Sequence, residues 1–391
     1  MPKQPVQPQP QPPATLWIAT RKGLFSARPV AGATARTGAW RLDERIGFLG
    51  EPVSAVLVDR RPEARGEPAA LYVALRLGHF GCKLHVSRDG GASWTELPAP
   101  VYPPKPADAR QADGEPDNNS WTLDTIWTLE TGGADQPGRL WAGTVPGGLF
   151  RSDDSGRSWQ LVESLWNTAE RPKWFGGGYD QPGIHSVCVD PRDSRALLVA
   201  VSCGGVWRSS DDGAGWRLTG LGQRADFMPP DLAGDLVNQD PHRVVRCPGR
   251  PDRLWMQHHC GILRSDDGGD HWVPIDGVAP SGFGFAVAVH PQDGDTAWFV
   301  PAVKDQTRVP VDARLIVNRT RSAGAGFEAL DTGLPAPSWD LVYRHALDVA
   351  ADGRMLAMAS TTGGAWLSQD GGDHWHALSV HLPPVAAVRL V

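Results

Sequence analysis

Histidine is the residue type whose spacing points most directly to chemistry in this chain of 391 residues. Three histidines begin similar apolar segments: His185 opens His-Ser-Val-Cys-Val-Asp-Pro, His242 opens His-Arg-Val-Val-Arg-Cys-Pro, and His345 opens His-Ala-Leu-Asp-Val-Ala-Ala. Imidazole binds divalent transition metals, and it also titrates near neutral pH. The matched positions therefore indicate a metal site or acid–base catalysis, with a structural role in a polar channel as the third interpretation.

Three further histidines stand shortly before a repeated serine motif. His258 and His259 precede Ser265, and His79 precedes Ser87. Three protein ligands that leave one position open form the arrangement of catalytic zinc sites, and imidazole also suits iron, copper and nickel. The metal hypothesis thus assigns ligand or neighbouring roles to His79, His185, His242, His258, His259 and His345. No nucleotide cofactor is expected.

Acidic, aromatic and basic residues accompany the histidine segments. Asp240 comes just before His242 and Arg344 just before His345, while Tyr179 and Asp180 end a long loop, residues 167–183. Glu51 precedes another apolar run. Long loops on a rigid scaffold commonly carry binding sites, and two carboxylates can act as acid and base on a glycosidic bond. These five residues are the candidate catalytic residues.

A repeated motif indicates which elements position these residues. The pattern Ser-x-Asp-x-Gly-x-x-Trp occurs with its serine at Ser87, Ser152, Ser209, Ser265 and Ser368. Asp can cap a turn, Gly supplies positive φ, and Trp can fold back on its hairpin as a small local core. The serines are 65, 57, 56 and 103 residues apart, so the last gap holds one more unit, at Thr320 to Phe327. An eroded unit before Trp40 brings the number of repeats to seven.

Each repeat contains about four short apolar runs, the pattern of a β-propeller blade. The sequence therefore predicts an all-β fold, a single seven-bladed propeller over residues 15–391. The run from Val385 to Leu390 is expected to supply the innermost strand of the first blade and close the ring. Residues 1–14 are rich in Pro and Gln, which predicts a disordered tail.

The five motif copies resemble those of the Asp-box (BNR) repeat proteins, a superfamily that includes the sialidases. The chain looks closest to uncharacterised bacterial members described as glycosyl hydrolases or sialidase-like proteins. The resemblance implies a propeller and suggests a glycosidase. The sialidase catalytic pattern does not carry over: the early segment reads Thr20-Arg21-Lys22-Gly23 where sialidases have Arg-Ile-Pro, and no Glu is evidently placed beside a Tyr.

Composition restricts partners and compartment. The net charge is −6 without a basic cluster, which argues against nucleic acid or an anionic membrane as a partner. No apolar run is long enough to span a bilayer, and the N-terminus lacks the apolar stretch of a secretory signal. Five cysteines form no disulfide framework, so free thiols in the cytoplasm are expected. The oligomeric state is left open.

Together these features predict an enzyme that acts on a small polar molecule at the channel mouth. Its histidine cluster would bind a divalent metal and support hydrolysis, elimination or oxidation. The first alternative is a sialidase-like glycoside hydrolase that uses rim carboxylates on a saccharide. The second is a propeller that serves as a binding or assembly scaffold without catalysis.

Overall fold

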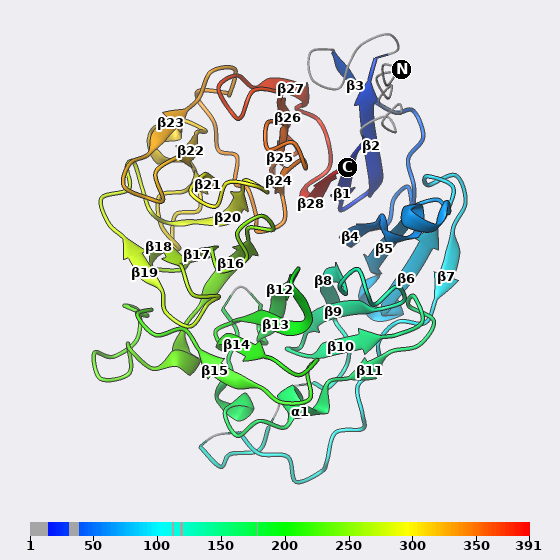
Figure 1. Cartoon of the computed structure of the whole chain (residues 1–391), viewed down its shortest axis with the longest axis vertical. Helices are drawn as coiled ribbons and strands as arrows, with labels where there is room; N and C mark the ends of the chain where they lie inside the picture. The colour runs from blue at the N-terminus through cyan, green and yellow to red at the C-terminus, as the bar shows by residue number, and fades with distance from the viewer. Residues whose placement is uncertain (1–14, 31–38, 112, 118–119, 178) are drawn as a thin grey trace, which may run out of the picture.

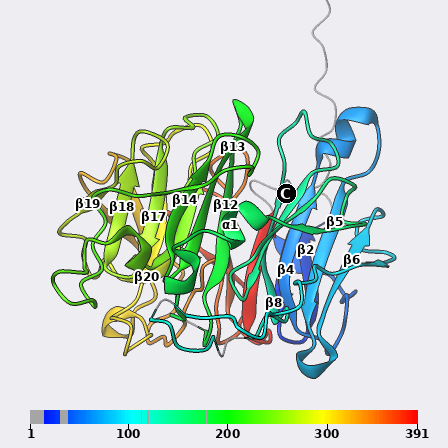
Figure 2. The same cartoon turned by 90° about the horizontal axis from the view of Figure 1, so that it is seen from below.

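Seven four-stranded antiparallel sheets make up the protein, and they are arranged as blades around a central axis (Figure 1). The computed structural model describes residues 15–30, 39–111, 113–117, 120–177 and 179–391. Viewed from below, the blades lie side by side, and their strands run roughly vertically in the picture (Figure 2). The prediction of an all-β, seven-bladed propeller is confirmed. The predicted tail, residues 1–14, lies outside the described residues.

Within each blade the strands follow one another from the axis outward, with the first blade taking its inner strand from the end of the chain. Blades 1 to 4 consist of β28 (Val385–Leu390), β1 (Leu16–Thr20), β2 (Gly23–Pro29) and β3 (Trp40–Leu42); β4 (Val53–Asp59), β5 (Ala70–Arg76), β6 (Cys82–Ser87) and β7 (Thr95–Leu97); β8 (Thr125–Thr131), β9 (Leu140–Val145), β10 (Leu149–Ser152) and β11 (Gln160–Leu161); and β12 (Gly183–Asp190), β13 (Asp193–Ser202), β14 (Gly205–Ser209) and β15 (Arg217–Thr219).

Blades 5 to 7 consist of β16 (Pro241–Arg246), β17 (Leu254–His258), β18 (Gly261–Ser265) and β19 (Val273–Ile275); β20 (Gly284–Val289), β21 (Ala297–Pro301), β22 (Val317–Thr320) and β23 (Glu328–Leu330); and β24 (Leu347–Val349), β25 (Leu356–Ala359), β26 (Ala365–Ser368) and β27 (His376–Ser379). Helix is limited to short turns at α1 (Glu163–Trp166) and at the 3-10 segments Arg61–Arg65, Gly78–Phe80, Arg171–Lys173, Leu236–Asn238 and Val311–Ala313. No helix of the described residues is long and apolar enough to cross a membrane.

The two ends of the chain close the ring. Strand β28 pairs antiparallel with β1, in a register that places Leu390 opposite Leu16 and Val388 opposite Ile18. On its other sides β28 contacts the inner strands of blades 7 and 2, β24 and β4. The predicted closure by the C-terminal strand is therefore confirmed, and it leaves β1 paired along both of its edges.

The repeated motif forms the hairpin between the third and fourth strands of its blade, which we call the box hairpin. In blade 5, Ser265 Oγ donates to Asp267 Oδ1 at 2.9 Å and accepts from the Gly269 N–H at 2.9 Å. Asp267 Oδ1 also accepts from the backbone N–H of His271 at 3.0 Å. Burial raises the pKa of Asp267, but hydrogen bonds from the backbone and side chain of His271, from Ser265 and from the Asp270 amide outweigh it and hold the pKa at about 2. The hairpin thus satisfies its own turn amides.

The motif tryptophan fills the seam between two blades, which the sequence alone did not predict. Trp272 of blade 5 is 2% exposed and packs in one cluster with Leu198 and Ala200 of blade 4. Gly269 approaches the same seam so closely that a Cβ on it would lie 2.3 Å from Leu198 Cδ1. The expectation of a core confined to the hairpin is corrected: each box hairpin also joins its blade to the preceding one.

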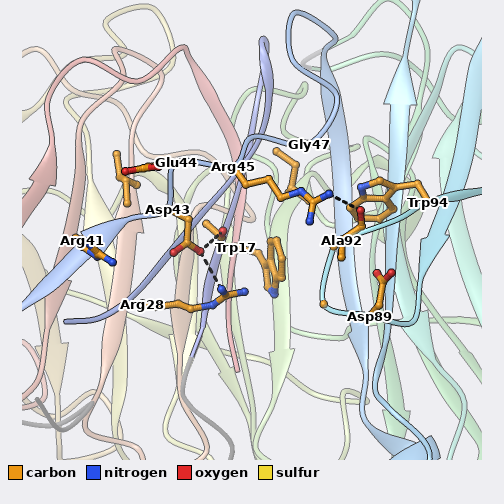
Figure 3. A pocket seen from close by; sticks show the side chains of 15 residues that line it. Trp17, Arg28, Arg41, Asp43, Glu44, Arg45, Gly47, Asp89, Ala92 and Trp94 are labelled. Carbon is orange, nitrogen blue, oxygen red and sulfur yellow. Dashed lines mark hydrogen bonds and ion pairs between the residues drawn. The ribbon is translucent and has the colours of Figure 1, made fainter. Parts of the chain in front are cut away.

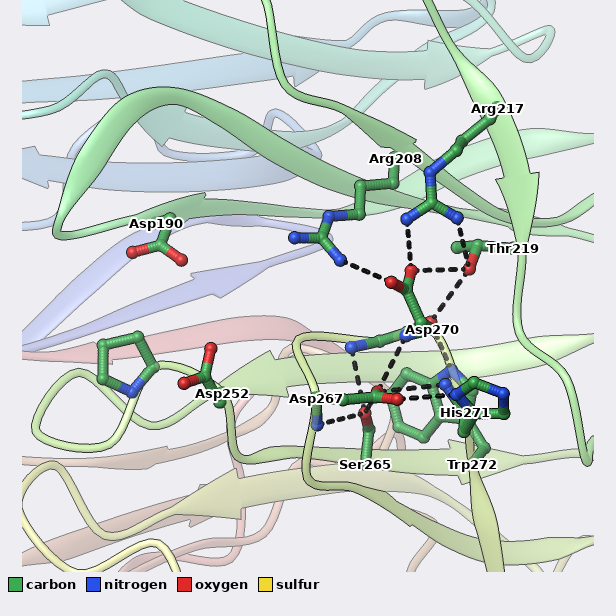
Figure 4. A network of polar contacts seen from close by, with 12 residues as sticks. Asp190, Arg208, Arg217, Thr219, Asp252, Ser265, Asp267, Asp270, His271 and Trp272 are labelled. Carbon is green, nitrogen blue, oxygen red and sulfur yellow. Dashed lines mark hydrogen bonds and ion pairs between the residues drawn. The ribbon is translucent and has the colours of Figure 1, made fainter.

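Ion pairs reinforce the same seams at the box hairpins. Asp270, in the blade 5 hairpin, contacts Arg208 at 3.0 Å and Arg217 at 2.5 Å, both from blade 4 (Figure 4). Asp212 in the blade 4 hairpin contacts Arg139 of blade 3 at 2.5 Å, and Asp373 in blade 7 contacts Arg319 of blade 6 at 2.7 Å. An acidic residue of one hairpin therefore recurrently pairs with an arginine of the blade before it.

A cavity of about 510 Å³ lies at the seam between blades 1 and 2. Trp17 and Trp94 contribute to its wall, Asp43 contacts Arg28 at 3.5 Å, and Arg45 donates to the Ala92 carbonyl (Figure 3). Its lining includes the box hairpin of blade 2, so it is separate from the channel mouth described below.

Removal of residues 385–391 is expected to abolish cooperative thermal unfolding. The truncation removes every β28–β1 pair and leaves blade 1 without its inner strand. Circular dichroism melting of the truncated chain checks this, with removal of residues 1–13 as the control that should melt like the full chain. A truncated chain with an unchanged melting transition would contradict the closure.

The box hairpins are expected to stabilise the seams rather than the site. Trp272→Ala should lower the free energy of unfolding by about 3–5 kcal/mol through loss of a buried aromatic ring. Asp267→Ala should cost about 0.5–2 kcal/mol through loss of the turn cap. The exposed Asp276→Ala serves as a control and should change stability by less than about 0.5 kcal/mol. Chemical denaturation measures all three, and equal stabilities for Trp272→Ala and the control would refute the assignment.

Candidate functional site at the channel mouth

Six of the seven inner strands share a register shift close to the point where they begin. The register of β12 shifts between Ile184 and Ser186, so that His185 is the bulged residue, and β16 shifts in the same way around His242. Bulges re-aim side chains and are frequent beside functional sites. The equivalent bulged positions in β4, β8, β20 and β28 are occupied by Ser54, Trp127, Phe285 and Ala386.

A pocket of about 910 Å³ opens where these strands begin. Four bulge or strand-start residues line it: Ser54, Trp127, His345 and Ala386. The turns between second and third strands contribute the rest of the wall, together with the segments that lead into the inner strands. The lining residues from these turns and segments include Arg21, Lys22, Gly50, Arg76, Tyr179, Arg308, Tyr343, Arg344 and Thr361. The predicted location of the site on this face thus corresponds to a real pocket.

The pocket is strongly cationic. Five of its lining residues are basic (Arg21, Lys22, Arg76, Arg308 and Arg344), whereas none of the lining residues that the structure describes is acidic. Arg76 pairs with Asp124 at 2.9 Å and Arg308 pairs with Asp305, both outside the lining. The charge of the wall therefore favours a ligand that carries a negative group.

Arg344 is the most unusual of these cations because it is only 7% exposed. Its Nε has no hydrogen-bond partner, and its guanidinium takes part in no ion pair within the described part of the chain. The guanidinium instead stacks on two rings, with its Cζ 4.9 Å from the Trp127 centroid and 5.3 Å from the Phe285 centroid. Burial lowers the pKa of Arg344. A buried cation held between rings is arranged to receive an anionic partner.

The other predicted catalytic residues differ in how deeply their side chains are buried. Tyr179 lines the pocket with its ring edge on Trp127, the two centroids 4.9 Å apart, and burial raises its pKa. Glu51 and Asp180 are exposed, and each adjoins lining residues in sequence. Asp240 is 4% exposed and lies outside the lining, in blade 5.

Asp240 is the centre of a polar cluster beside the pocket. Its Oδ1 accepts from Ser202 Oγ and from the Cys203 backbone N–H, each at 3.2 Å. Its Oδ2 lies 3.4 Å from His242 Nε2 and 3.3 Å from His259 Nδ1. Burial alone would raise the pKa of Asp240, but His242, His259 and Arg344 outweigh it and hold the pKa well below its usual range. The carboxylate is therefore ionised.

The three histidines at matched positions do not converge on one point, and this corrects the predicted metal set. His185 Nε2 donates to the Pro241 carbonyl at 2.7 Å, and His345 Nε2 donates to the His185 carbonyl at 2.8 Å. His242 Nδ1 donates to the Gly284 carbonyl at 2.7 Å. Each ring instead satisfies a backbone carbonyl of another inner strand. Burial holds the pKa of His185 and of His345 well below the usual value.

The other three predicted ligands, His79, His258 and His259, lie in different surroundings. His259 joins Asp240 and His242, and of the described His, Cys, Asp and Glu residues these are the three whose ligand atoms lie within 4.8 Å of one another. His258 is fully buried, with its ring nitrogens 3.2 and 3.1 Å from the backbone nitrogens of Asp240 and Cys260, and burial lowers its pKa to about 3. His79 is exposed and stacks on Phe80.

Sequence reasoning gave no role to several residues of the mouth. Trp127, Arg76 and Arg308 line the pocket, and Phe285 forms the stack that joins Arg344 to His242. The register of the inner strands was a usable signal for Trp127, because it occupies the bulge position of β8 just as His185 does in β12. Arg308 lies in the β21–β22 connection, where no repeat pattern marks it.

Comparison with curated proteins finds xyloglucanases. Over 371 residues, 92% of the chain, the sequence is 24% identical to the oligoxyloglucan-reducing end-specific xyloglucanase of Emericella nidulans. The chain is similar to xyloglucanases. A xyloglucanase of a Paenibacillus species is 29% identical over 152 residues, 35% of this chain and 14% of that protein. The chain spans 39% of the length of the Emericella enzyme. No protein-family profile matches it.

Solved structures agree on the fold. An ancestral GH74 enzyme aligns with a TM-score of 0.55 and 14% identity, covering 83% of this chain and 38% of its own. The GH74 xyloglucanase of Xanthomonas campestris gives 0.51 with 20% identity over 84% and 45%. A chain of a mitotic checkpoint complex gives 0.52 with 11% identity over 90% and 83%. These similarities establish the propeller, and membership of a sialidase-like group stays a prediction.

The buried histidines of the mouth make stability depend on pH. Because the folded-state pKa values of His185 and His345 are lowered, only the unfolded chain takes up protons there as the pH falls below about 6.5. The melting temperature should therefore drop from pH 7 to pH 5. His345→Gln, which keeps a donor for the His185 carbonyl, should flatten this slope. The exposed His376→Gln should leave it as in the wild type, and equal slopes for all three proteins would contradict the explanation.

Proposed function

We propose that the protein is a glycoside hydrolase whose saccharide substrate binds in the mouth pocket. The observation that carries the proposal is the alignment of 92% of the chain with a xyloglucanase, together with a pocket of about 910 Å³ on the face where propeller loops converge. Trp127, Tyr179 and Tyr343 offer ring faces and edges in this pocket, as aromatic-lined ligand sites do.

The charge of the pocket favours an acidic saccharide over a neutral one. Arg344 is buried and its Nε has no hydrogen-bond partner in the described residues, and Arg21, Lys22 and Arg308 line the same space. Guanidinium binds carboxylate through two parallel N–H···O bonds, so one arginine can both attract and orient a uronate ring. The proposed substrate is therefore an oligosaccharide with a carboxylate-bearing residue.

Hydrolysis of a glycosidic bond requires two carboxyl groups on opposite sides of the scissile bond. Glu51 precedes β4 in blade 2 and Asp180 precedes β12 in blade 4, and each follows a lining residue of the pocket in sequence, Gly50 and Tyr179. We assign the acid–base pair to Glu51 and Asp180. Asp240 is not assigned as the proton donor, because its low pKa keeps it ionised.

Hydrolysis of oligosaccharides, measured as the release of new reducing ends, tests the proposal. The protein should cleave a uronate-containing oligosaccharide faster than a neutral xyloglucan fragment. Glu51→Gln and Asp180→Asn should each lower kcat by about 10²-fold or more through loss of a proton-transfer group. Arg344→Met should raise KM at least tenfold for the acidic substrate. Arg344→Lys, which keeps the positive charge, should raise KM less.

The control is Arg195→Met, because Arg195 lies in blade 4 beside the box hairpin and pairs with Asp193 rather than lining the pocket. Its kinetics should match the wild type. Absence of hydrolysis across the panel would overturn the enzymatic proposal and favour the scaffold. Equal effects of Arg344→Met on acidic and neutral substrates would overturn the assigned substrate charge.

A further inference from the structure

The carboxylate of Asp240 has an oxygen that the protein leaves without a close donor. Its Oδ1 receives the Ser202 hydroxyl and the Cys203 N–H, whereas Oδ2 faces two imidazole nitrogens at 3.3 and 3.4 Å. Charge-assisted N–H···O bonds are about 2.7–2.9 Å long. The two separations are longer than such bonds, although all three residues are held in place by other contacts.

The hydrogen bond of His242 to a carbonyl decides which of its ring nitrogens carries the hydrogen. Its Nδ1 lies 2.7 Å from the Gly284 carbonyl, and a carbonyl can only accept, so Nδ1 carries the hydrogen. In the neutral ring Nε2 then bears a lone pair, and this lone pair faces the carboxylate oxygen of Asp240. Two acceptors placed against each other in a buried site repel, and either a proton on Nε2 or a metal ion between the two atoms removes this repulsion. Phe285, stacked on His242 at 4.5 Å, helps to hold the ring there.

The distances suit a metal ion between these atoms. Ligand atoms about 2.0–2.2 Å from a tetrahedral or octahedral ion lie roughly 3.0–3.5 Å from each other. The contacts of Asp240 Oδ2 with both rings fall in this range. A ligating histidine also usually donates its other ring N–H to a carbonyl or carboxylate, as His242 does to Gly284.

The surrounding chain fixes the three ligands and leaves one side open. Cys203 adopts a left-handed conformation with φ 48°, which turns its N–H towards Asp240, and the His259 N–H donates to the Asp240 carbonyl at 3.0 Å. Gly177 covers the other side so closely that a Cβ there would lie 3.3 Å from Asp240 Oδ2. The His259 side chain is 22% exposed and borders solvent, so an ion can enter past it.

We propose that Asp240, His242 and His259 bind a divalent first-row transition metal. Two imidazoles and one carboxylate form a set that zinc, iron(II), cobalt(II) and manganese(II) all accept. The site is separated from the mouth pocket by Phe285 and does not depend on the proposed hydrolysis. It differs from the ligand set expected from sequence, which included His185 and His345 and placed Asp240 among the catalytic residues instead.

Cobalt(II) titration of chelator-treated full-length protein without a histidine tag tests the site through its visible absorption. The expected result is saturable binding of one ion per chain, displaced by zinc. His259→Ala and Asp240→Asn should each weaken binding at least tenfold. His259 is partly exposed, so its variant should fold, and melting curves without metal verify this.

His271→Ala is the matched control. His271 is also paired with an aspartate, through Nδ1 at 2.7 Å from Asp267, but it lies exposed in a box hairpin without a second histidine. Its cobalt binding should equal that of the wild type. Binding that is absent, that survives in both His259→Ala and Asp240→Asn, or that is lost in His271→Ala would overturn the site. So would nitrogen-15 shifts that show His242 doubly protonated at pH 7 in the presence of excess zinc.

Discussion

The seam between neighbouring blades is the constraint on which the rest of the molecule depends. Each face of a propeller blade is buried by packing against a neighbouring blade, so every seam must be filled and held in register. Here one short hairpin does both. Its serine and aspartate satisfy the turn amides, its tryptophan enters the seam, and a neighbouring aspartate pairs with an arginine of the preceding blade, as Ser265, Asp267, Trp272 and Asp270 do in blade 5.

Fixing the outer seams also fixes the inner strands, and these carry the site. The inner strands contact one another around the ring, and six of them have a register shift near their first residues. Because the shifts recur at equivalent positions, side chains far apart in sequence meet at one face. Trp127 and His345 are 218 residues apart, yet they line the same pocket. Loop residues such as Tyr179 and Arg308 then give this face its individual chemistry.

The fold was predictable from sequence because a repeat with four fixed positions reports its own local geometry. Serine, aspartate, glycine and tryptophan each have a physical role in the hairpin, and their spacing gave seven blades, including the degenerate one at Thr320. The box tryptophan folds back on its hairpin as expected, with Trp272 Nε1 donating to the Gly269 carbonyl at 3.0 Å, but a local pattern does not show that the same ring also contacts the preceding blade. Closure by β28 followed from the need to pair an edge strand.

The site was predictable only in its location. Register placed His185, His242 and His345 at one rim, but register does not fix the direction of a side chain. All three rings donate to carbonyls of other inner strands, while His259, from a turn, joins His242 and Asp240. The burial of Arg344 between Trp127 and Phe285 likewise depends on three blades at once. Such contacts arise from tertiary packing and leave no mark in a single repeat.

The mouth pocket and the Asp240 cluster lie on one face, joined by the stack of Arg344, Phe285 and His242. We propose that the protein meets its ligand on this face, rather than on the box face or in the cavity beside Trp17 and Trp94. A crystal structure with a bound uronate-containing oligosaccharide measures this most directly. The account predicts sugar density in the mouth, with a carboxylate on the Arg344 guanidinium. Density in the cavity between blades 1 and 2, with the mouth occupied only by solvent, would contradict it.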